Sequence, residues 1–579
     1  MARVFASQEL VSRIARGLIG HLYPRDDFIY VQALSQVCRA TRGPALDFWW
    51  HTQYSLYYVL RALGDAVEYT IRTPGRRHIG LARPIQDAEW YQFRYYASKI
   101  KRLSSRADRT VHGPEPRAPS FDIDKTLLNA LLARGLPLLP SLERLVWPQE
   151  GIEESFDPNL ALALFVTPRL KSFRAIGEED SQVAFADAVM ACLSDKRPPL
   201  DTFCLVDEYE KNWDECAIIL NTVQNTVRIL EYSNVPEDDL HRLAGLPHLE
   251  RVLIPLYNMC ESDVDVFFQK VGGITTHPFS LLKALTLRCD GVLSVASHFL
   301  RSWHWDAALE EILIDLPNPA DDDSIDGPSL SQLIHALTQL PHLAHLHTVR
   351  ISGPRASTRW VEEALVGPAS LLPLLGFAHL QHVALSVEAC FDLDDWFVAD
   401  AARAWPRLRT LDLGCAGRWP VGRKPGISLG SLARLAHWCV YLEVLRIRVN
   451  ALDWPRGEFY RKGVARCWAL RELDVGSSPI GVNMVTKVST YLLDIFPLMT
   501  SLGTDTNDID EENIARWRVS NEGNEAFPML WRAVWAYIST GQLHRFNTLE
   551  YEYIREDVMK SVRRHFPNGR PHLLEFVAV

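Results

Sequence analysis

The sequence predicts an α/β fold, in which an N-terminal helical module precedes an irregular solenoid of strand–helix repeats. Three observations support this prediction. The composition is that of a folded globular chain, with 47% apolar and 23% charged residues among 579. A segment near the start of the sequence carries apolar residues at helical spacing. A short apolar pattern then recurs from about residue 140 onward.

The helical module is predicted to span residues 1–60. In "LSQVCRATRGPALDFWWHTQYSLYYVL", one face of a first helix carries Leu34, Val37 and Cys38. We expect Gly43–Pro44 to end this helix, because proline fits best in the first turn of the next one. The second helix presents a broad apolar stripe at three- and four-residue steps, made of Leu46, Trp49, Trp50, Tyr54, Tyr57 and Leu60. Either the rest of the chain or another protein must cover this stripe.

Residues 61–120 are predicted to form a connecting helix and a linker. The segment that carries Trp90, Phe93 and Ala97 on one helical face is expected to lead into the first strand of the repeats. Residues 107–120, "ADRTVHGPEPRAPS", are rich in proline and charge, which is typical of a loop.

Residues 121–579 are predicted to form the solenoid. In the recurring pattern, as in "LRTLDL", the last two apolar residues alternate with polar ones, which indicates a strand with one buried face. Full or weaker copies begin at Ile100, Leu142, Leu170, Leu200, Val227, Leu249, Leu282, Leu309, Leu346, Leu380, Leu408, Leu442, Leu470, Met499 and Phe546. A strand and a helix at intervals of about 22 to 37 residues are typical of a leucine-rich-repeat horseshoe. The alternative is a non-repetitive α/β domain in a leucine-rich chain.

The variable residues beside the strand leucines are expected to face the concave side of this horseshoe, because successive side chains of a strand alternate. The charged ones are candidates for binding a protein substrate: Arg251, Arg288, Glu311, Arg350, Asp412, Arg446, Arg448, Glu472 and Asp474. Their mixed signs predict a partner of mixed charge. For each of them, the alternative is a solvated surface residue.

The net charge and the spacing of the cysteines disfavour some classes of protein. A net charge of −10 weighs against non-specific nucleic-acid binding, which needs a basic surface. The ten cysteines stand singly, as expected for thiols in a reducing compartment, the cytoplasm or the nucleus.

No apolar run reaches the ~18 residues of a membrane span. The opening "MARVFASQELVSRIARG" lacks the apolar core of a secretory signal, and Glu9 disfavours the alternative of a mitochondrial presequence.

One motif suggests an enzyme. "GISLG", Gly426–Gly430, matches the G-x-S-x-G nucleophile elbow, but "RWPVGRKP" before it cannot be the buried strand that the elbow requires. Ser428 is expected to cap the helix that starts near Leu429 instead. The acidic segments 318–329 and 503–514 lack the ligand spacing of a calcium loop, and no phosphate-binding or dinucleotide fingerprint is present. We therefore expect no catalytic residue, no cofactor and no metal, so the protein is not expected to be an enzyme.

The block "QELVSRIARGLIGHL … YVQALSQVCRATRGPALDFWW" resembles a divergent F-box followed by leucine-rich repeats, as found in the large F-box-like families of mushroom-forming fungi. The likeness is strongest in residues 34–60, in the valine-cysteine-arginine core, the proline-alanine-leucine-aspartate turn and the tryptophan. "RPIQDAEWYQFRYYASKIKRLS" is similar to the segment that such proteins place before their first repeat strand. The resemblance thus covers residues 1–105 by motif and the remainder by repeat architecture.

The resemblance implies a substrate-recognition subunit of an SCF-type (cullin-RING) ubiquitin ligase. Its partners would be a Skp-type adaptor and a protein substrate, with neither nucleic acid nor a membrane. The positions that match the adaptor-binding residues of F-box modules are Leu10, Ile14, Leu18, Leu22, Leu34, Val37 and Cys38. Ala6 and Ser7 replace the leucine-proline that usually opens the motif. The alternative is therefore a leucine-rich-repeat scaffold whose degenerate F-box does not bind the adaptor.

Overall fold

The computed structural model describes residues 39–53, 56–73, 76–104, 120–147, 158–176, 182–206, 216–232, 235, 237–257, 259–274, 278–289, 293–304, 307–316, 327–353, 365–387, 389–414, 424–452, 454, 466–476, 478–504 and 526–543. The chain divides into two compact units, residues 1–254 and 255–579. Each unit is built mainly of parallel strands that alternate with helices along the chain.

The first unit contains a parallel sheet in the order β1-β4-β6-β7-β8-β9-β10. Its strands are β1 (Thr52–Gln53), β4 (Arg102–Leu103), β6 (Arg144–Val146), β7 (Ser172–Ile176), β8 (Thr202–Val206), β9 (Ile229–Tyr232) and β10 (Arg251–Pro255). Its helices are α3 (Arg39–His51), α4 (Leu56–Leu60), η1 (Arg61–Ala66), α5 (Asp87–Ala97), α6 (Lys125–Ala133), α7 (Pro158–Phe165), α8 (Gln182–Lys196), α9 (Cys216–Val223) and α10 (Glu237–Leu243).

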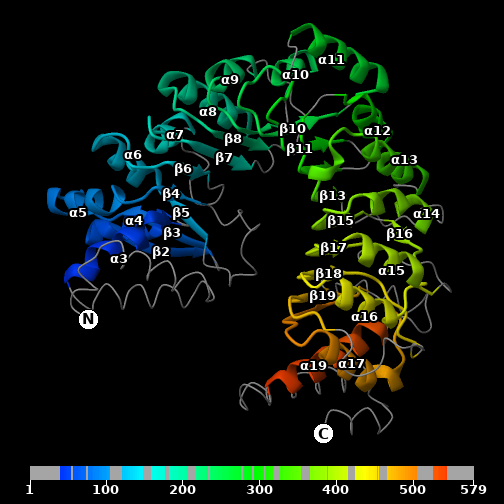
Figure 1. The fold of residues 1–579 in the computed structure, drawn as a ribbon. Helices are drawn as coiled ribbons and strands as arrows, with labels where there is room; N and C mark the ends of the chain where they lie inside the picture. Colours follow the sequence, from blue (N-terminus) through cyan, green and yellow to red (C-terminus); the bar gives the residue numbers. More distant parts are fainter. Residues whose placement is uncertain are drawn as a thin grey trace. The chain divides into compact units, whose positions relative to one another are not determined.

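The second unit repeats this arrangement in the strand order β11-β12-β13-β15-β17-β18-β19-β20. These strands are β11 (Ala284–Arg288), β12 (Glu311–Asp315), β13 (Thr348–Ser352), β15 (His382–Ser386), β17 (Thr410–Asp412), β18 (Val444–Arg446), β19 (Glu472–Asp474) and β20 (Ser501–Gly503). The helices are α11 (Glu261–Ile274), α12 (Leu293–Ser302), α13 (Gly327–Thr338), η2 (Leu343–His345), α14 (Pro368–Leu371), η3 (Leu372–Gly376), α15 (Asp395–Ala404), α16 (Leu429–Trp438), η5 (Val482–Met484), α17 (Val485–Ile495) and α19 (Ala526–Leu543). In Figure 1, α12 to α16 line one side of this unit and β13, β15, β17, β18 and β19 line the other. The short strands β14 (Leu365–Val366) and β16 (Cys390–Phe391) pair separately.

The repeat pattern of the sequence predicts where these strands begin. Each strand starts two residues after the first apolar residue of its copy, as Thr410 follows Leu408 and Val444 follows Leu442. Every copy from Ile100 to Met499 forms such a strand, and the copy at Phe546 lies outside the described residues. The prediction of an α/β solenoid-like repeat fold is confirmed at this level.

The strands form because their central leucines are buried between repeats. Leu411, Leu445 and Leu473 occupy the same position in successive strands and are at most 1% exposed. Burial of one such side chain contributes about 1.5 to 3 kcal/mol, so neighbouring repeats stabilise each other mainly through this row of leucines.

The predicted helix boundaries between residues 34 and 60 are wrong. Helix α3 continues through Gly43–Pro44 and ends at His51, where β1 begins. Proline within the helix removes one backbone hydrogen bond, and the next residue, Ala45, is fully buried. The second helix cannot run from Leu46 to Leu60, because the backbone of β1 pairs with β4 at the edge of the repeat sheet.

The chain itself covers part of the aromatic stripe. The rings of Trp50 and Tyr96 pack with their centroids 4.6 Å apart, which joins α3 to α5. Tyr57 meets Tyr69 edge-on at 5.4 Å. These contacts come from residues of the same unit and cover the stripe in part: Leu60 is buried, whereas Trp50 and Tyr57 stay partly exposed.

The connecting segment contains both the expected helix and a sheet that the sequence did not predict. Helix α5 buries Phe93 and Ala97 and leads into β4, as expected. The strands β2 (Val67–Thr73), β3 (Arg76–Leu81) and β5 (Ser120–Ile123) form a separate sheet, in which β2 and β3 are antiparallel.

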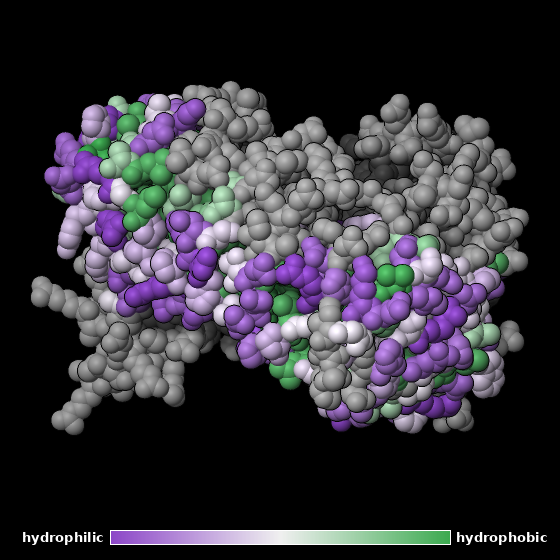
Figure 2. Space-filling model, turned by 90° about the horizontal axis from the view of Figure 1, so that it is seen from above, coloured by the Kyte–Doolittle hydropathy of each residue, from purple (hydrophilic) through white to green (hydrophobic). Residues whose placement is uncertain are grey.

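The surface of the described residues is mixed in polarity. On the face seen in Figure 2, hydrophilic residues predominate and hydrophobic ones form small, separate patches. Cys204, Cys289, Cys439 and Cys467 are buried, whereas Cys260 is exposed. Among the helices that the structure describes, none is both long and apolar enough to cross a bilayer.

Candidate protein-interaction face

The strands of the second unit present one side-chain face away from the helices, which we call the open face. Because successive side chains of a strand alternate, it consists of the first, third and fifth residues of each strand, whereas second and fourth residues such as Leu445 are buried. The strand register pairs equal positions, so Leu313 lies beside Arg350, and Asp412 lies beside Arg446. Each position therefore forms a row that runs across the unit.

The structure places most of the predicted substrate-binding residues on these rows. The first position holds Glu311 and Glu472, the third position holds Arg350, Asp412, Arg446 and Asp474, and the fifth position holds Arg288. Arg448 lies two residues beyond β18, and Arg251 is the first residue of β10. Three of the nine, Arg288, Asp412 and Arg448, are no more than 7% exposed. Substrate binding by any of them stays a prediction.

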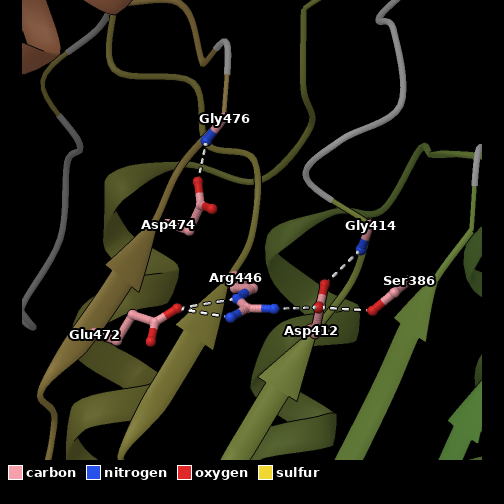
Figure 3. Close-up of polar contacts among 7 residues, drawn as sticks. All are labelled: Ser386, Asp412, Gly414, Arg446, Glu472, Asp474 and Gly476. Atoms are coloured by element: carbon pink, nitrogen blue, oxygen red, sulfur yellow. Dashed lines mark hydrogen bonds and ion pairs between the residues drawn. The ribbon is translucent and has the colours of Figure 1, made fainter. Parts of the chain in front are cut away.

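A polar network joins strands β15, β17, β18 and β19 (Figure 3). The carboxylate of Asp412 accepts hydrogen bonds from the Ser386 hydroxyl at 2.8 Å, the backbone N–H of Gly414 at 3.1 Å and Arg446 Nη1 at 3.3 Å. Arg446 also donates to Glu472 Oε1 from Nε at 3.1 Å and from Nη2 at 2.8 Å. Burial opposes the charge of Arg446, but Glu472 and then Asp412 outweigh it and raise the pKa of the guanidinium. These four strands are thus linked by side chains as well as by the backbone.

Asp474 lies in register with Arg446 on the other side of β18. Its carboxylate accepts a hydrogen bond from the backbone N–H of Gly476 at 2.9 Å. Burial raises the pKa of Asp474, because the bond from Gly476 and the charge of Arg446 do not fully compensate for lost hydration. The network therefore contains a carboxylate whose charge is disfavoured in the folded protein.

A second ionic contact lies on the fifth-position row. Arg288 Nε is 3.1 Å from Asp315 Oδ2, and the hydroxyl of Ser352 donates to Asp315 Oδ1 at 3.1 Å. The Arg288 side chain is only 8% exposed, and Asp315 compensates for its charge. Arg288 is therefore a poor candidate for contact with a partner.

In the first unit, the third-position row brings together Arg174, Cys204 and Glu231. The thiol of Cys204 donates to Glu231 Oε2 at 3.2 Å, and Arg174 Nη2 is 3.8 Å from the same carboxylate. Burial and then the negative charge of Glu231 raise the pKa of Cys204. A thiol held protonated in this way is a weak nucleophile.

Ser428 caps helix α16, as predicted. Its hydroxyl accepts from Gly430 N at 3.1 Å and donates to Asp395 Oδ2 at 2.7 Å. The hydroxyl of Ser431 donates to the same carboxylate at 2.5 Å. Ser428 therefore joins the start of α16 to the start of α15, and its hydroxyl both donates and accepts a hydrogen bond.

The sequence interpretation missed a row of alternating charge, which we call the charge ladder. It consists of the residue directly before each strand from β4 to β19 of the repeat sheet: Lys101, Glu143, Lys171, Asp201, Arg228 and Glu250 in the first unit, and Lys283, Glu310, His347, Gln381, Arg409, Glu443 and Arg471 in the second. Neighbouring members are joined by the backbone, as when Glu443 N donates to Arg409 O at 2.7 Å. Ion pairs between neighbouring members include Lys171–Glu143 at 3.3 Å and Arg409–Glu443 at 3.1 Å. Each of these residues is the second of its repeat copy, so the alternation of charge could have been found by comparing that position from copy to copy.

The positions predicted to bind an adaptor, Leu10, Ile14, Leu18, Leu22, Leu34, Val37 and Cys38, lie outside the described residues. The same is true of Ala6 and Ser7. Within the part of the chain that is described, no group of three or more His, Cys, Asp and Glu side chains is placed to hold a metal ion.

Comparison with known proteins gives no family. No family model and no curated protein matches the chain. Among solved structures, a chain of the "Crystal structure of Rad7 and Elc1 complex in yeast" is similar at 13% sequence identity, over 68% of this chain and 88% of that chain, with a TM-score of 0.31. A likeness of this strength carries no argument about function.

Proposed function

We propose that the protein is the substrate-recognition subunit of an SCF-type ubiquitin ligase. The observation that carries the proposal is the open face of the second unit, where consecutive repeats gather charged side chains while their leucines are buried on the other side. Such a face suits recognition of a protein, because its side chains can vary without loss of the core. The resemblance of residues 1–60 to an F-box supplies the link to the ligase.

In this role the protein catalyses no reaction itself. Residues near the start of the chain, including Leu10, Ile14 and Leu18, would bind the Skp-type adaptor, and the open face would hold the substrate. Attachment to one complex raises the effective concentration of the substrate's lysines near the ubiquitin-loaded enzyme.

The test is co-expression with a Skp-type adaptor followed by affinity capture. The truncated variant lacks residues 1–38 and keeps α3 and β1, because β1 pairs with β4 in the sheet of the first unit. A matched full-length variant, Leu10→Asp with Ile14→Asp, keeps the chain length. The expected result is stoichiometric capture of the adaptor by the full chain and by an Arg350→Glu variant, but by neither altered N-terminus.

If the folded full chain does not capture the adaptor, the ligase proposal is wrong. The non-enzymatic scaffold with a degenerate F-box then becomes the better description.

A further inference from the structure

The charge ladder of the second unit is interrupted at one place. Continued alternation would put an acid between His347 and Arg409, but Gln381 stands there. The two flanking side chains pair away from it, His347 with Glu310 at 3.5 Å and Arg409 with Glu443 at 3.1 Å. The ladder therefore provides no carboxylate at the step between β13 and β17.

Arg350 lies on the open face beside this step. It is exposed, and its in-register neighbours are Leu313 and Ala384, neither of which carries a charge. Among the residues that the structure describes, no ion pair to its guanidinium is formed. The nearest acid of its row, Asp412, lies two strands away, about 10 Å at the usual strand spacing, and is engaged by Arg446.

His382 completes this part of the face. It occupies the first position of β15, and its Nδ1 lies 3.1 Å from the hydroxyl of Thr410. Burial and then the positive charges of Arg350, His347 and Arg409 lower its pKa. His382 thus lies near the cations Arg350, His347 and Arg409. On the neighbouring strand β12, Glu311 and Asp315 occupy the first and fifth positions, and Asp315 pairs with Arg288.

Arg446 occupies the same third position in its strand as Arg350, but neighbouring acids compensate for its charge. Its in-register neighbours are Asp412 and Asp474, and Glu472 accepts two of its hydrogen bonds. We propose that the open face at β13 and β15 binds an acidic segment of a protein partner, whose carboxylate pairs with Arg350 while Gln381 and His382 supply hydrogen bonds. The inference rests on the proposed function only in taking the open face as the receptor surface.

The charges around the site favour a short run of Asp or Glu over a long polyanion. Nucleic acid would have to pass the acidic network of Asp412, Glu472 and Asp474, which lies on neighbouring strands of the same sheet. A phosphate group is usually bound by several cations together, whereas this site offers one exposed guanidinium.

The test measures fluorescence anisotropy of labelled peptides on the full chain at physiological salt. The probes are a glutamate-rich peptide and the same peptide with glutamine, phosphoserine or lysine in place of glutamate. We expect the glutamate peptide to bind at least about tenfold more tightly than the glutamine peptide. Arg350→Glu should lower that affinity by at least about tenfold and should allow the lysine peptide to bind.

The matched control is Arg403→Glu, which makes the same change of charge on the exposed side of α15. It should leave the affinity for the glutamate peptide within about twofold. Circular dichroism and urea unfolding check that both variants are folded.

Three outcomes would overturn the inference: equal binding of the glutamate and glutamine peptides, equal losses from Arg350→Glu and Arg403→Glu, or binding of the phosphoserine peptide alone. Failure here with intact adaptor capture removes this site and leaves the ligase proposal. Loss of adaptor capture with intact peptide binding removes the ligase and leaves the site.

Discussion

Arg350 and Arg446 occupy the same position on the open face, yet their surroundings are opposite. Arg350 lies between Leu313 and Ala384, whereas Arg446 lies between Asp412 and Asp474. The repeat pattern assigns both arginines the same role, and only the residues on adjacent strands distinguish them. Arg446 therefore links neighbouring strands through acids of its own row, whereas Arg350 has no acid in register with it.

In the region around Arg446, the largest loss of stability is expected from a substitution of Gly414. This glycine has φ +62°, and a Cβ there would meet the ring of Phe391 at 2.6 Å and Leu385 O at 3.2 Å. Gly414→Ala should lower the free energy of unfolding by about 2 to 4 kcal/mol, from left-handed backbone strain and overpacking. Urea unfolding measures the loss. Gly376→Ala, where nothing lies within 4 Å of the added atom, is the control.

Truncation of the two arginines compares the regions directly. Arg446→Ala removes the donor to Glu472 and Asp412, so we expect a loss of about 1 to 2 kcal/mol in the free energy of unfolding. Arg350→Ala, at an exposed and unpaired position of the described surface, should change it by less than about 0.5 kcal/mol. Equal effects in parallel urea titrations would remove the distinction between the two regions.

A smaller effect, which depends on pH, is expected at Asp474. Its pKa is raised in the folded protein, so its contribution to stability is present below the unfolded pKa of about 4 and is lost as pH rises through the folded pKa. Asp474→Asn keeps an acceptor for the Gly476 N–H and removes the charge. The variant should be more stable than the parent at pH 7, and the difference should vanish below pH ~4. A difference independent of pH would assign the effect to packing.

The smallest effect on stability comes from repair of the charge ladder. Gln381→Glu puts an acid between His347 and Arg409, and each new pair should stabilise the fold by about 0.2 to 1 kcal/mol. The same substitution places a negative charge beside Arg350, so affinity for the glutamate peptide should fall. Thermal unfolding and anisotropy on one sample measure both. Gln339→Glu, a change in the turn after α13, is the control for charge alone.

Much of the fold could be predicted from the sequence, because the same local rule operates in every repeat. The alternation after Leu408 or Leu442 marks a strand wherever a neighbour repeats it, and the cap at Ser428 follows from local backbone chemistry. The candidate face could be predicted to the extent that alternating residues share a face.

The remainder depends on contacts between distant residues. Thr52–Gln53 is a strand only because Arg102–Leu103 is beside it, and nothing within residues 34–60 shows this. The sheet of β2, β3 and β5 joins segments separated by a whole helix. Likewise, the difference between Arg350 and Arg446 follows from strand order, which no single repeat encodes.

The charge ladder affects how well the fold tolerates the loss of repeats. Members of opposite sign lie side by side, so loss of the one repeat that carries Glu143 would place Lys101 next to Lys171. Like charges in adjacent strands destabilise a sheet, whereas removal of two consecutive repeats restores the alternation. Deletion of a pair of repeats should therefore destabilise the sheet less than deletion of a single one.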